Sequence, residues 1–309
     1  MSKIVVTGGA GFIGSHLVEL LLEDGHEVHI IDNLSSGRES NLKNAKGAAL
    51  HVMDIRSSET QELLQSLEPE VVIHAAAQIS VTRSMREPVF DISVNLCGLL
   101  NILSAFAGGA LPFFTFISTG GAIYGEQQVF PATESHPNLP TSVYGLSKRS
   151  SEMYLDLWAR QFGLKYGVLR LSNVYGPRQD PHGEAGVVAI FSQLLLEGKS
   201  VTIFGSGEQT RDFVYVKDVA RAVREVSMRR QTGTYNIGTA IETSINDLLK
   251  EFCSIMQCDF NPHYVPARTG EQLRSVIDPS LAKKTFGWVP EKTLRDGLVE
   301  TLEWFKDEN

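Results

Sequence analysis

The sequence predicts an α/β protein: a doubly wound parallel sheet in the first part of the chain, followed by a smaller C-terminal domain. Two observations carry this prediction. Short apolar runs alternate with helical patterns over the first third of the chain, which is typical of a parallel sheet with helices on both faces. Further along, the run Asn173-Val174-Tyr175-Gly176-Pro177 follows a strand-like segment, and its glycine and proline indicate an exit from regular structure and a change of domain.

The chain opens with a strand and a glycine-rich turn. Residues 3–7 (Lys-Ile-Val-Val-Thr) are a β-branched run, a helical pattern with leucines on its apolar face follows, and Gly25 closes that helix before a second strand at 27–32. A G-x-x-G-x-x-G turn lets a pyrophosphate approach the helix N-terminus and lets the helix pack close to the sheet. A chance glycine loop is the alternative, but the strand–turn–helix context favours a dinucleotide site. The residues of this turn expected at the cofactor are Gly8, Gly11, Phe12, Ile13 and Gly14.

An acid ends the second strand. Asp32 stands about 18 residues beyond Gly14, where a dinucleotide-binding unit carries the carboxylate that binds the adenosine ribose 2′-hydroxyl. Asn33, the next residue, is expected to contact the cofactor as well. Because an acid here repels a 2′-phosphate, we expect NAD rather than NADP. Arg38 is the nearby cation that could weaken this preference.

Strands and helices continue to alternate after this unit. The expected elements are a strand at 49–53, a helix at 59–67, a strand at 71–74, a helix at 94–107 and a strand at 113–118. Residues 78–86 are expected to form a polar loop. Asn95 is expected to open or cap the helix that comes next and to contact the cofactor.

Two of these strand ends suit a dinucleotide. Asp54 and Ile55 follow the third strand and are expected at the adenine. Three small residues, Ala75, Ala76 and Ala77, follow the fourth strand, where the cofactor must come close to the backbone. Plain close packing is the alternative for the alanines.

Tyr144 and Lys148 form the most informative pair in the chain. They are four residues apart, so on a helix their side chains share one face about a turn from each other. A phenol is ordinarily protonated at neutral pH, and a nearby ammonium is expected to lower its pKa. Such a pair makes a general base that removes a proton from a hydroxyl while a hydride leaves the same carbon. A surface pair on a helix is the alternative.

Two hydroxyl residues end the strand at 113–118. A side chain at the carboxyl end of a central strand points into the crevice where ligands of doubly wound folds bind. Ser118 and Thr119 are therefore candidates to bond a substrate oxygen, and the alternative is that they only cap the strand.

Taken together, these motifs and the later run Arg211-Asp212-Phe213-Val214-Tyr215-Val216 resemble the extended short-chain dehydrogenase/reductases, specifically the UDP-galactose (UDP-glucose) 4-epimerase group. The resemblance covers nearly the whole chain. It implies that Tyr144 is the catalytic base, that Lys148 holds the NAD ribose and lowers the pKa of Tyr144, and that Ser118 or Thr119 bonds the sugar 4-oxygen. Many members carry the catalytic hydroxyl where Gly120 stands here, so Thr119 is preferred to Ser118.

The resemblance also implies a set of substrate contacts. Asn173 matches a residue that bonds the substrate's phosphate or sugar, and a helix beginning within 183–190 is expected at the diphosphate. The strand at 201–204 resembles the uracil-contacting segment, with an ordinary edge strand as the alternative. The residues expected to bind substrate are Thr119, Asn173, Val188, Thr202, Phe204, Arg211 and Arg268 for the phosphates, base and sugar, Glu271 for the uridine ribose, and Ser275 beside the sugar's C2 substituent.

The same resemblance suggests domain limits. Residues 1–172 would form an NAD-binding Rossmann domain, with return segments near 213–258, and residues 173–309 the nucleotide-sugar domain. Within this scheme the strand at 234–238 and the helix at 244–258 are expected to return to the first domain. A helix at 293–305 is expected to end the fold.

Composition limits the partners. A net charge of −8 argues against a nucleic acid or an acidic membrane surface, and no run of about 18 apolar residues could cross a bilayer. The start does not read as a signal peptide, so we expect a cytoplasmic protein. The three cysteines, Cys97, Cys253 and Cys258, lack metal-ligand spacing, which predicts thiols in a reducing compartment and no metal site.

A homodimer is expected from the resemblance, through the helices at 94–107 and 147–162. The second of these carries Met153, Tyr154, Leu157, Trp158 and Phe162, which is more apolar surface than one sheet face should absorb. The alternative is that all five belong to the core.

The predicted function is NAD-dependent 4-epimerisation of a UDP-hexose through a 4-keto intermediate. The glucose/galactose pair is expected, and the small Ser275 extends the prediction to the N-acetylated pair, because a pocket that must clash with the acetamido group cannot do so with serine. The alternatives are a UDP-glucuronate 4-epimerase, a 4,6-dehydratase and a non-catalytic NAD-binding regulator. Dehydratases carry an Asp-Glu pair where Gly120 and Gly121 stand, and a regulator has no need of Tyr144 with Lys148.

Overall fold

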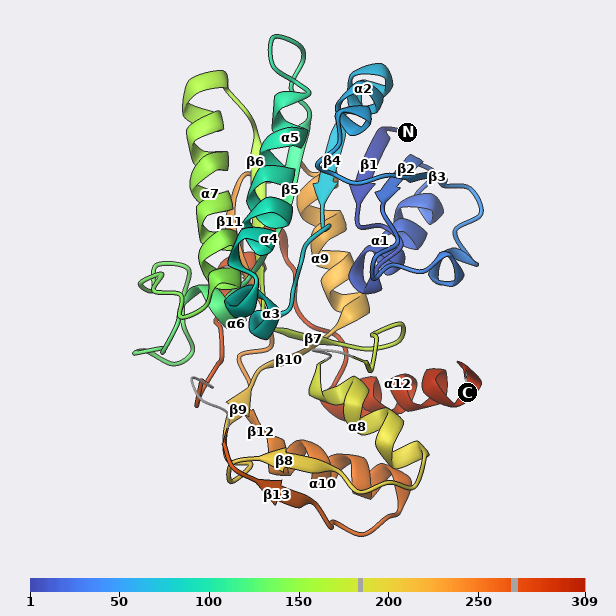
Figure 1. The fold of residues 1–309 in the computed structure, drawn as a ribbon, viewed down its shortest axis with the longest axis vertical. Helices are drawn as coiled ribbons and strands as arrows, with labels where there is room; N and C mark the ends of the chain where they lie inside the picture. Colours follow the sequence, from blue (N-terminus) through green and yellow to red (C-terminus); the bar gives the residue numbers. More distant parts are fainter. Residues whose placement is uncertain (183–185, 268–271, 309) are drawn as a thin grey trace.

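The computed structural model describes residues 1–182, 186–267 and 272–308. Within these residues the centre of the fold is a sheet of seven parallel strands in the order β11-β6-β5-β4-β1-β2-β3 (Figure 1). The strands are β1 (Lys3–Thr7), β2 (Glu27–Asp32), β3 (Ala49–Val52), β4 (Val71–His74), β5 (Phe113–Thr119), β6 (Tyr166–Leu171) and β11 (Gly233–Ile237). The strand order reverses between β1 and β4, which opens a crevice at their carboxyl ends. The predicted doubly wound parallel sheet is confirmed.

Helices cover both faces of this sheet because successive strand residues point to opposite sides. Ile4 and Val6 of β1 lie in one apolar cluster, whereas Val5 between them lies in the other. The helices of the first cluster are α1 (Phe12–Glu23), α9 (Val216–Met228) and α11 (Ser280–Phe286), and those of the second are α2 (Ser58–Leu67), α5 (Gly98–Ser104) and α7 (Val143–Phe162). With both faces covered, the central strands β1, β4 and β5 are buried along nearly their whole length.

A third apolar cluster lies beyond the carboxyl ends of the strands (Figure 1). Its helices are α8 (Val187–Leu196), α10 (Ile245–Met256) and α12 (Leu294–Glu308). Three short strand pairs lie in this part of the chain: β7 (Asn173–Tyr175) with β10 (Phe213–Tyr215), β8 (Thr202–Phe204) with β13 (His263–Val265), and β9 (Thr210–Arg211) with β12 (Thr243–Ser244). Phe191 of α8 and Phe252 of α10 pack edge to face in the middle of this cluster, with ring centroids 6.1 Å apart.

Of the two segments expected to return to the first domain, the strand at 234–238 does so and the helix at 244–258 does not. β11 pairs with β6 at the edge of the main sheet, as expected for 234–238. The helix at 244–258 was expected to join the same domain, but α10 places Leu248, Leu249 and Phe252 in the third cluster with α8 and α12. An amphipathic helix pattern states that one face is buried and not which cluster buries it.

The segment after β4 also differs from its prediction. Residues 78–86 were expected to be a polar loop, but Val81–Arg86 form helix α3, capped by the Ser80 side chain, which accepts a hydrogen bond from the Arg83 N–H. The helix expected at 94–107 begins earlier, as α4 (Pro88–Ile92), passes through a π-helical turn, η2 (Ser93–Cys97), and ends with α5 at Ser104. The other short helices are η1 (Glu39–Leu42) and α6 (Gly120–Ile123). In the part of the chain described, no helix is long and apolar enough to span a membrane.

Candidate active site

The candidate site lies at the carboxyl ends of β1, β2, β4 and β5, at the crevice where the strand order reverses. At the end of β1 the glycine turn is tightly packed. Gly8 has a φ of +72°, and a Cβ there would lie 2.6 Å from the backbone nitrogen of Ala76. A Cβ on Gly14 would lie 2.1 Å from the carbonyl oxygen of Gly8. Only glycine can let α1, the turn and the chain after β4 come this close.

Helix α1 begins directly after this turn with free backbone donors. Among the described residues no side chain caps it and its first turn holds no acid, so the helix N-terminus can receive an anion. Ala75, Ala76 and Ala77 leave β4 beside Gly8, so the backbones of the two segments lie close together. A cradle of glycine and alanine at a helix N-terminus fits a pyrophosphate.

Asp32 is held in place at the end of β2. Its carboxylate accepts hydrogen bonds from the backbone N–H groups of Ala10 (3.0 Å) and Leu34 (2.9 Å), and the side chain is buried. A Cβ on Gly37 would lie 2.9 Å from both carboxylate oxygens. Arg38 pairs instead with Asp180 at 3.2 Å, so the carboxylate of Asp32 keeps its charge free to repel a phosphate.

Asp54 follows β3 and is hydrogen-bonded to the side chains of Arg56 and Asn33. It accepts two hydrogen bonds of 2.8 Å from the Arg56 guanidinium and one of 3.0 Å from the Asn33 side chain. The Arg56 hydrogen bond lowers the pKa of Asp54 to about 2. The sequence reasoning did not single out Arg56. Ile55, the residue between them, is buried against the other face of the sheet.

The helix-capping role expected for Asn95 is wrong, whereas its contact with the cofactor stays a prediction. Asn95 neither opens nor caps a helix, because it lies inside the π-helical turn η2. Its side chain accepts from the Gln78 N–H (2.8 Å) and donates to the Gln78 carbonyl (2.9 Å), to Asp91 (3.1 Å) and to the Ser147 hydroxyl (3.3 Å). Asn95 therefore ties the chain after β4 to helix α7. A π-helical turn rotates the side chains that follow it relative to the α-helical period, so a pattern of 3.6 residues per turn does not predict where Asn95 points.

Helix α7 brings Tyr144 and Lys148 to the crevice. Its N-terminus is capped by Ser142, which accepts from the Gly145 N–H at 3.1 Å, and the Tyr144 N–H donates to the Ser84 hydroxyl of α3 at 3.1 Å. Lys148 is 3% exposed, donates from Nζ to the Ile117 carbonyl at 2.9 Å and lies 4.7 Å from the centroid of the Phe116 ring. Burial lowers the pKa of Lys148 to about 8, against the pull of Asp91 and Glu152.

The phenol does not have the low pKa expected from the sequence. Burial raises the pKa of Tyr144 to about 12, although a hydrogen bond from the Thr119 side chain favours the phenolate. The buried carboxylate of Asp91 adds to the rise. The Lys148 ammonium, on the same helix face, donates to the Ile117 carbonyl.

Ser118 and Thr119 point to opposite sides of β5. The Ser118 hydroxyl donates to the buried carboxylate of Glu152 at 2.6 Å, whereas the Thr119 hydroxyl lies near the Tyr144 phenol and acts to lower its pKa. Because successive strand residues point to opposite sides, the two hydroxyls do not share a partner. Thr119 stays the predicted partner of the sugar 4-oxygen, and Ser118 faces the packing between β5 and α7.

Glu152 belongs to a buried polar network that the sequence reasoning missed. It pairs with Arg170 of β6 through contacts of 2.6 Å and 3.0 Å, and Arg170 donates to the Tyr124 hydroxyl at 3.1 Å. Tyr124 in turn donates to Asn236 of β11 at 2.6 Å. A signal was present, because Glu152 follows Tyr144 and Lys148 at the same four-residue spacing and so shares their helix face.

The two glycines after Thr119 have different reasons to be small. A Cβ on Gly120 would lie 2.8 Å from the Ile277 side chain, so a larger residue would require Ile277 to shift. A Cβ on Gly121 would meet only the oxygens of Asn173 (3.7 Å) and Thr119 (3.8 Å). The Asn173 Oδ1 is buried without a hydrogen-bond partner in the described chain. Gly121 thus leaves a space between two polar oxygens, as a site for a polar ligand requires.

The remaining candidates lie on the other side of the crevice. Thr202 and Phe204 are on β8, and Arg211 is on β9, where its guanidinium donates to the Thr210 carbonyl at 2.7 Å. Val188 is buried in the third apolar cluster, so it can offer a ligand its backbone but not its side chain. Asp212, next to Arg211, fixes the chain in place because its carboxylate accepts a hydrogen bond from the Thr239 N–H at 2.9 Å. Arg268 and Glu271 lie outside the described residues.

Ser275 is buried, with 3% of its surface exposed. Its neighbour Arg274 is drawn away by Glu242 (2.9 Å) and stacks over the Phe130 ring at 3.6 Å. The Gln272 side chain donates to the Gly125 carbonyl. Both residues that could have filled the space expected at Ser275 are therefore engaged elsewhere.

Comparison with known proteins identifies a relationship over the whole length. The NAD dependent epimerase/dehydratase family matches residues 4–238. A UDP-glucose 4-epimerase from Thermotoga maritima, solved with UDP-glucose, is 46% identical with a TM-score of 0.95, each chain covering 99% of the other. A Thermus thermophilus UDP-glucose 4-epimerase solved with NAD is 40% identical, with a TM-score of 0.92 over 98% of this chain and 99% of that one. A Methanobrevibacter ruminantium UDP-N-acetylglucosamine 4-epimerase, in complex with UDP-N-acetylmuramic acid, is 35% identical, with a TM-score of 0.94 over 100% and 99%.

Proposed function

The chain belongs to the NAD dependent epimerase/dehydratase family, and we propose that it is an NAD-dependent UDP-hexose 4-epimerase that interconverts UDP-glucose and UDP-galactose. The observation that carries the proposal is the placement of Thr119 beside Tyr144, at the end of β5 and near the glycine turn, where the Thr119 side chain acts to lower the pKa of Tyr144. It places a proton-transfer group and an oxygen-binding hydroxyl together where a dinucleotide cradle opens.

The residues present fit NAD. The turn at Gly8, Gly11 and Gly14, with Phe12 and Ile13 at the start of α1, would hold the pyrophosphate, and Asp32 with Asn33 the adenosine ribose. Asp54, Ile55 and the alanines at 75–77 would border the adenine and the cofactor backbone, and Asn95 would set the position of that last segment. When bound, NAD supplies the hydride acceptor and donor that an epimerase needs at one carbon.

Tyr144 and Thr119 act on the sugar 4-oxygen. Thr119 bonds the oxygen and fixes its position, and Tyr144 exchanges a proton with it, so that the 4-hydroxyl becomes the 4-keto group and is formed again on the other face. A phenol with a pKa of about 12 does not give up its proton readily at neutral pH. Lys148 carries a positive charge below its pKa of about 8 and would stabilise the phenolate while holding the nicotinamide ribose.

The substrate would lie between the sheet and the third apolar cluster. Asn173, with its unpaired oxygen, suits a hydroxyl or phosphate donor of the substrate, and Arg211 provides a fork for the diphosphate. The backbone near Val188 and the strand with Thr202 and Phe204 would contact the diphosphate and the base. Arg268 and Glu271 stay as predictions for the diphosphate and the ribose. On this proposal residues 1–172 bind NAD and residues 173–309 bind the nucleotide sugar, with α10 belonging to the second unit.

A 4,6-dehydratase is disfavoured by the packing of Gly120. Dehydration needs an acid and a base at this point, and a side chain on Gly120 would collide with Ile277.

A wider substrate range is supported by Ser275. Arg274 pairs with Glu242 and the Gln272 side chain donates to the Gly125 carbonyl, so both larger neighbours of Ser275 are held by other groups. The similarity to a UDP-N-acetylglucosamine 4-epimerase points the same way. We therefore include the N-acetylated pair among the substrates.

We further propose a homodimer through α7 and the α3–α4 segment beside it. Leu146, Met153, Leu157 and Phe162 of α7 are exposed, with Met153 at 57% and Phe162 at 63%, so these residues are not core. Val89 and Ile92 of α4 are exposed as well. Such an apolar surface is typical of a subunit interface.

Sedimentation at micromolar concentration is expected to show a dimer, and a monomer would contradict it. We place the protein in the cytoplasm, a reducing compartment that suits its three free cysteines.

The test of the main proposal is a coupled assay in which UDP-glucose formed from UDP-galactose is oxidised by UDP-glucose dehydrogenase. The purified protein should form UDP-glucose when no NAD is added to the epimerisation step. The hydride is removed and returned within one turnover, so this step consumes no NAD. Absence of UDP-glucose after prior loading with NAD would refute the proposal.

A further inference from the structure

Two of the three cysteines are brought together by the end of helix α10. Gln257 follows the helix in the left-handed conformation, with φ 55° and ψ 43°, and the Cys258 N–H donates to the Cys253 carbonyl at 3.1 Å. This six-to-one backbone bond is that of a Schellman motif, which brings the two ends of the turn together. Cys253 and Cys258 stand at those ends, and both line the same cavity. Both are free cysteines.

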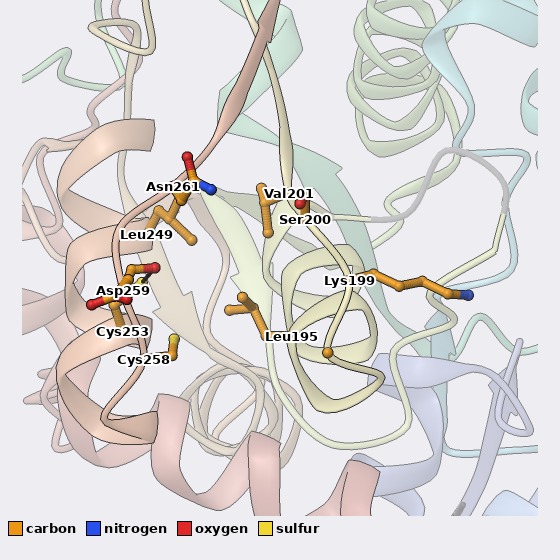
Figure 2. Close-up of a pocket in the computed structure, with 10 residues that line it drawn as sticks. Leu195, Lys199, Ser200, Val201, Leu249, Cys253, Cys258, Asp259 and Asn261 are labelled. Atoms are coloured by element: carbon orange, nitrogen blue, oxygen red, sulfur yellow. Dashed lines mark hydrogen bonds between the residues drawn. The ribbon is translucent and has the colours of Figure 1, made fainter.

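The pair borders a cavity of about 260 Å³ in the third apolar cluster (Figure 2). Leu195 of α8, Val201 and Leu249 line its apolar side, and none of the candidate active-site residues lines it. Figure 2 shows Cys253, Cys258 and Asp259 gathered on one wall. Small molecules can therefore reach the thiols without passing the crevice at the sheet.

The two thiols differ in environment. Cys253 is buried and donates its S–H to the Asp259 carbonyl at 3.6 Å, whereas Cys258 is exposed. Burial, the Cys258 thiol and Asp259 raise the pKa of Cys253 to about 11. The exposed thiol is thus placed to react first with a partner from solution, and the buried thiol is placed to react with its neighbour.

We propose that Cys253 and Cys258 form a redox-active dithiol that closes to an intramolecular disulfide on contact with a low-molecular-weight disulfide such as oxidised glutathione. The Cys258 thiolate attacks one sulfur of the external disulfide, whose S–S bond breaks and releases one glutathione thiol. Cys253 then loses its proton to solvent and attacks the Cys258 sulfur, which releases the second glutathione. The two protein thiols are oxidised by two electrons, and the external disulfide is reduced to two thiols.

Closure would join the end of α10 to the chain that enters β13. Val201, which lines the cavity, accepts a hydrogen bond from the His263 N–H at 2.8 Å, so the wall of the cavity is continuous with the β8–β13 pair. The oxidised protein is therefore expected to unfold at a higher temperature than the reduced protein, because the disulfide restricts the unfolded chain.

The experiment treats the full-length protein with oxidised glutathione, labels the remaining thiols with iodoacetamide and maps peptides by mass spectrometry. The wild type and a Cys97→Ser control should both yield a peptide linked through Cys253 and Cys258, free of glutathione and released by dithiothreitol. Cys253→Ser should instead retain glutathione on Cys258, and Cys258→Ser should leave Cys253 unmodified.

Two outcomes would overturn the proposal. One is wild-type protein that keeps glutathione on Cys258 as fully as Cys253→Ser does, which means that Cys253 does not resolve the adduct. The other is wild-type protein with both thiols still open to labelling after treatment. Since the linked peptide is sought in the wild type, the result does not depend on the folding of either cysteine variant.

Discussion

The two sides of the crevice are built differently. On the sheet side, the polar groups behind the reaction centre are buried and paired: Glu152 with Arg170 at 2.6 Å, Asn95 with Gln78 and Asp91, and Lys148 with the Ile117 carbonyl. On the substrate side, the corresponding ion pair, Arg274 with Glu242, is half-exposed, and Thr202 is exposed on a short strand. A reaction centre must be held rigidly, whereas a site for the base and the sugar can differ in shape between relatives.

This difference predicts where a substitution acts. Changes behind the reaction centre should reduce stability and turnover together, because they leave buried polar groups unpaired. Changes on the substrate side should alter the choice of sugar and leave the fold intact. Four tests, arranged in decreasing order of expected effect, can contradict or refine this difference.

Glu152→Ala should have the largest effect on stability. It leaves the buried Arg170 guanidinium without its carboxylate, which is expected to lower the free energy of unfolding by about 3–5 kcal/mol. Glu225→Ala removes partly exposed pairs with Arg224 and Arg229 and should cost less than about 1 kcal/mol. Urea unfolding of the two variants measures both values, and equal losses would show that the buried network is not the stronger of the two.

Thr119→Val and Ser118→Ala form a matched pair on one strand. Thr119→Val removes the hydroxyl that bonds Tyr144 and is expected to lower kcat by about 10²–10³, the usual effect of losing one donor to a developing oxyanion. Ser118→Ala removes a hydroxyl bonded to Glu152 and should mainly affect stability, by about 1–3 kcal/mol. If Ser118→Ala reduces kcat more than Thr119→Val, the two hydroxyls have been assigned the wrong way round.

Ser275→Tyr tests the substrate side. A phenol ring in place of a hydroxymethyl group should exclude the acetamido group, and kcat/KM for the N-acetylated pair should fall by at least about tenfold to hundredfold. The value for UDP-galactose should stay near that of the wild type. Either an N-acetyl activity that is absent from the wild type or one that survives the tyrosine would contradict the role of Ser275.

Lys148→Met should have an effect that depends on pH. With a pKa of about 8, Lys148 is charged below that pH and neutral above it, so its help to the Tyr144 phenolate is present below about pH 8 and is lost as the pH rises through that value. The nearby carboxylates of Asp91 and Glu152 favour the charged form and Tyr144 titrates higher. The ratio of wild-type to variant kcat should therefore shrink between about pH 7 and 10, and NAD retention should weaken. A ratio that stays constant over this range would remove the electrostatic role.

Local motifs made much of the fold and of the candidate site predictable from the sequence. The glycine turn, Asp32 at a strand end, and Tyr144 with Lys148 on one helix face each depend on residues near one another in the chain. The pKa of Tyr144, the position of Asn95 and the pair of Glu152 with Arg170 depend on how α4, α7 and β6 pack, which no short pattern reports. For the same reason the amphipathic pattern of α10 predicted a helix but not the cluster that buries it.

Tyr144→Phe tests the central claim most directly, with kcat for UDP-galactose as the measurement. The variant lacks only the hydroxyl that exchanges the proton, so it should keep its bound NAD, its circular dichroism spectrum and its melting temperature while kcat falls by about 10²–10⁴. Retained NAD with this loss would establish Tyr144 as the proton-transfer group of the 4-epimerase. A variant that epimerises UDP-galactose at the wild-type rate would contradict the account.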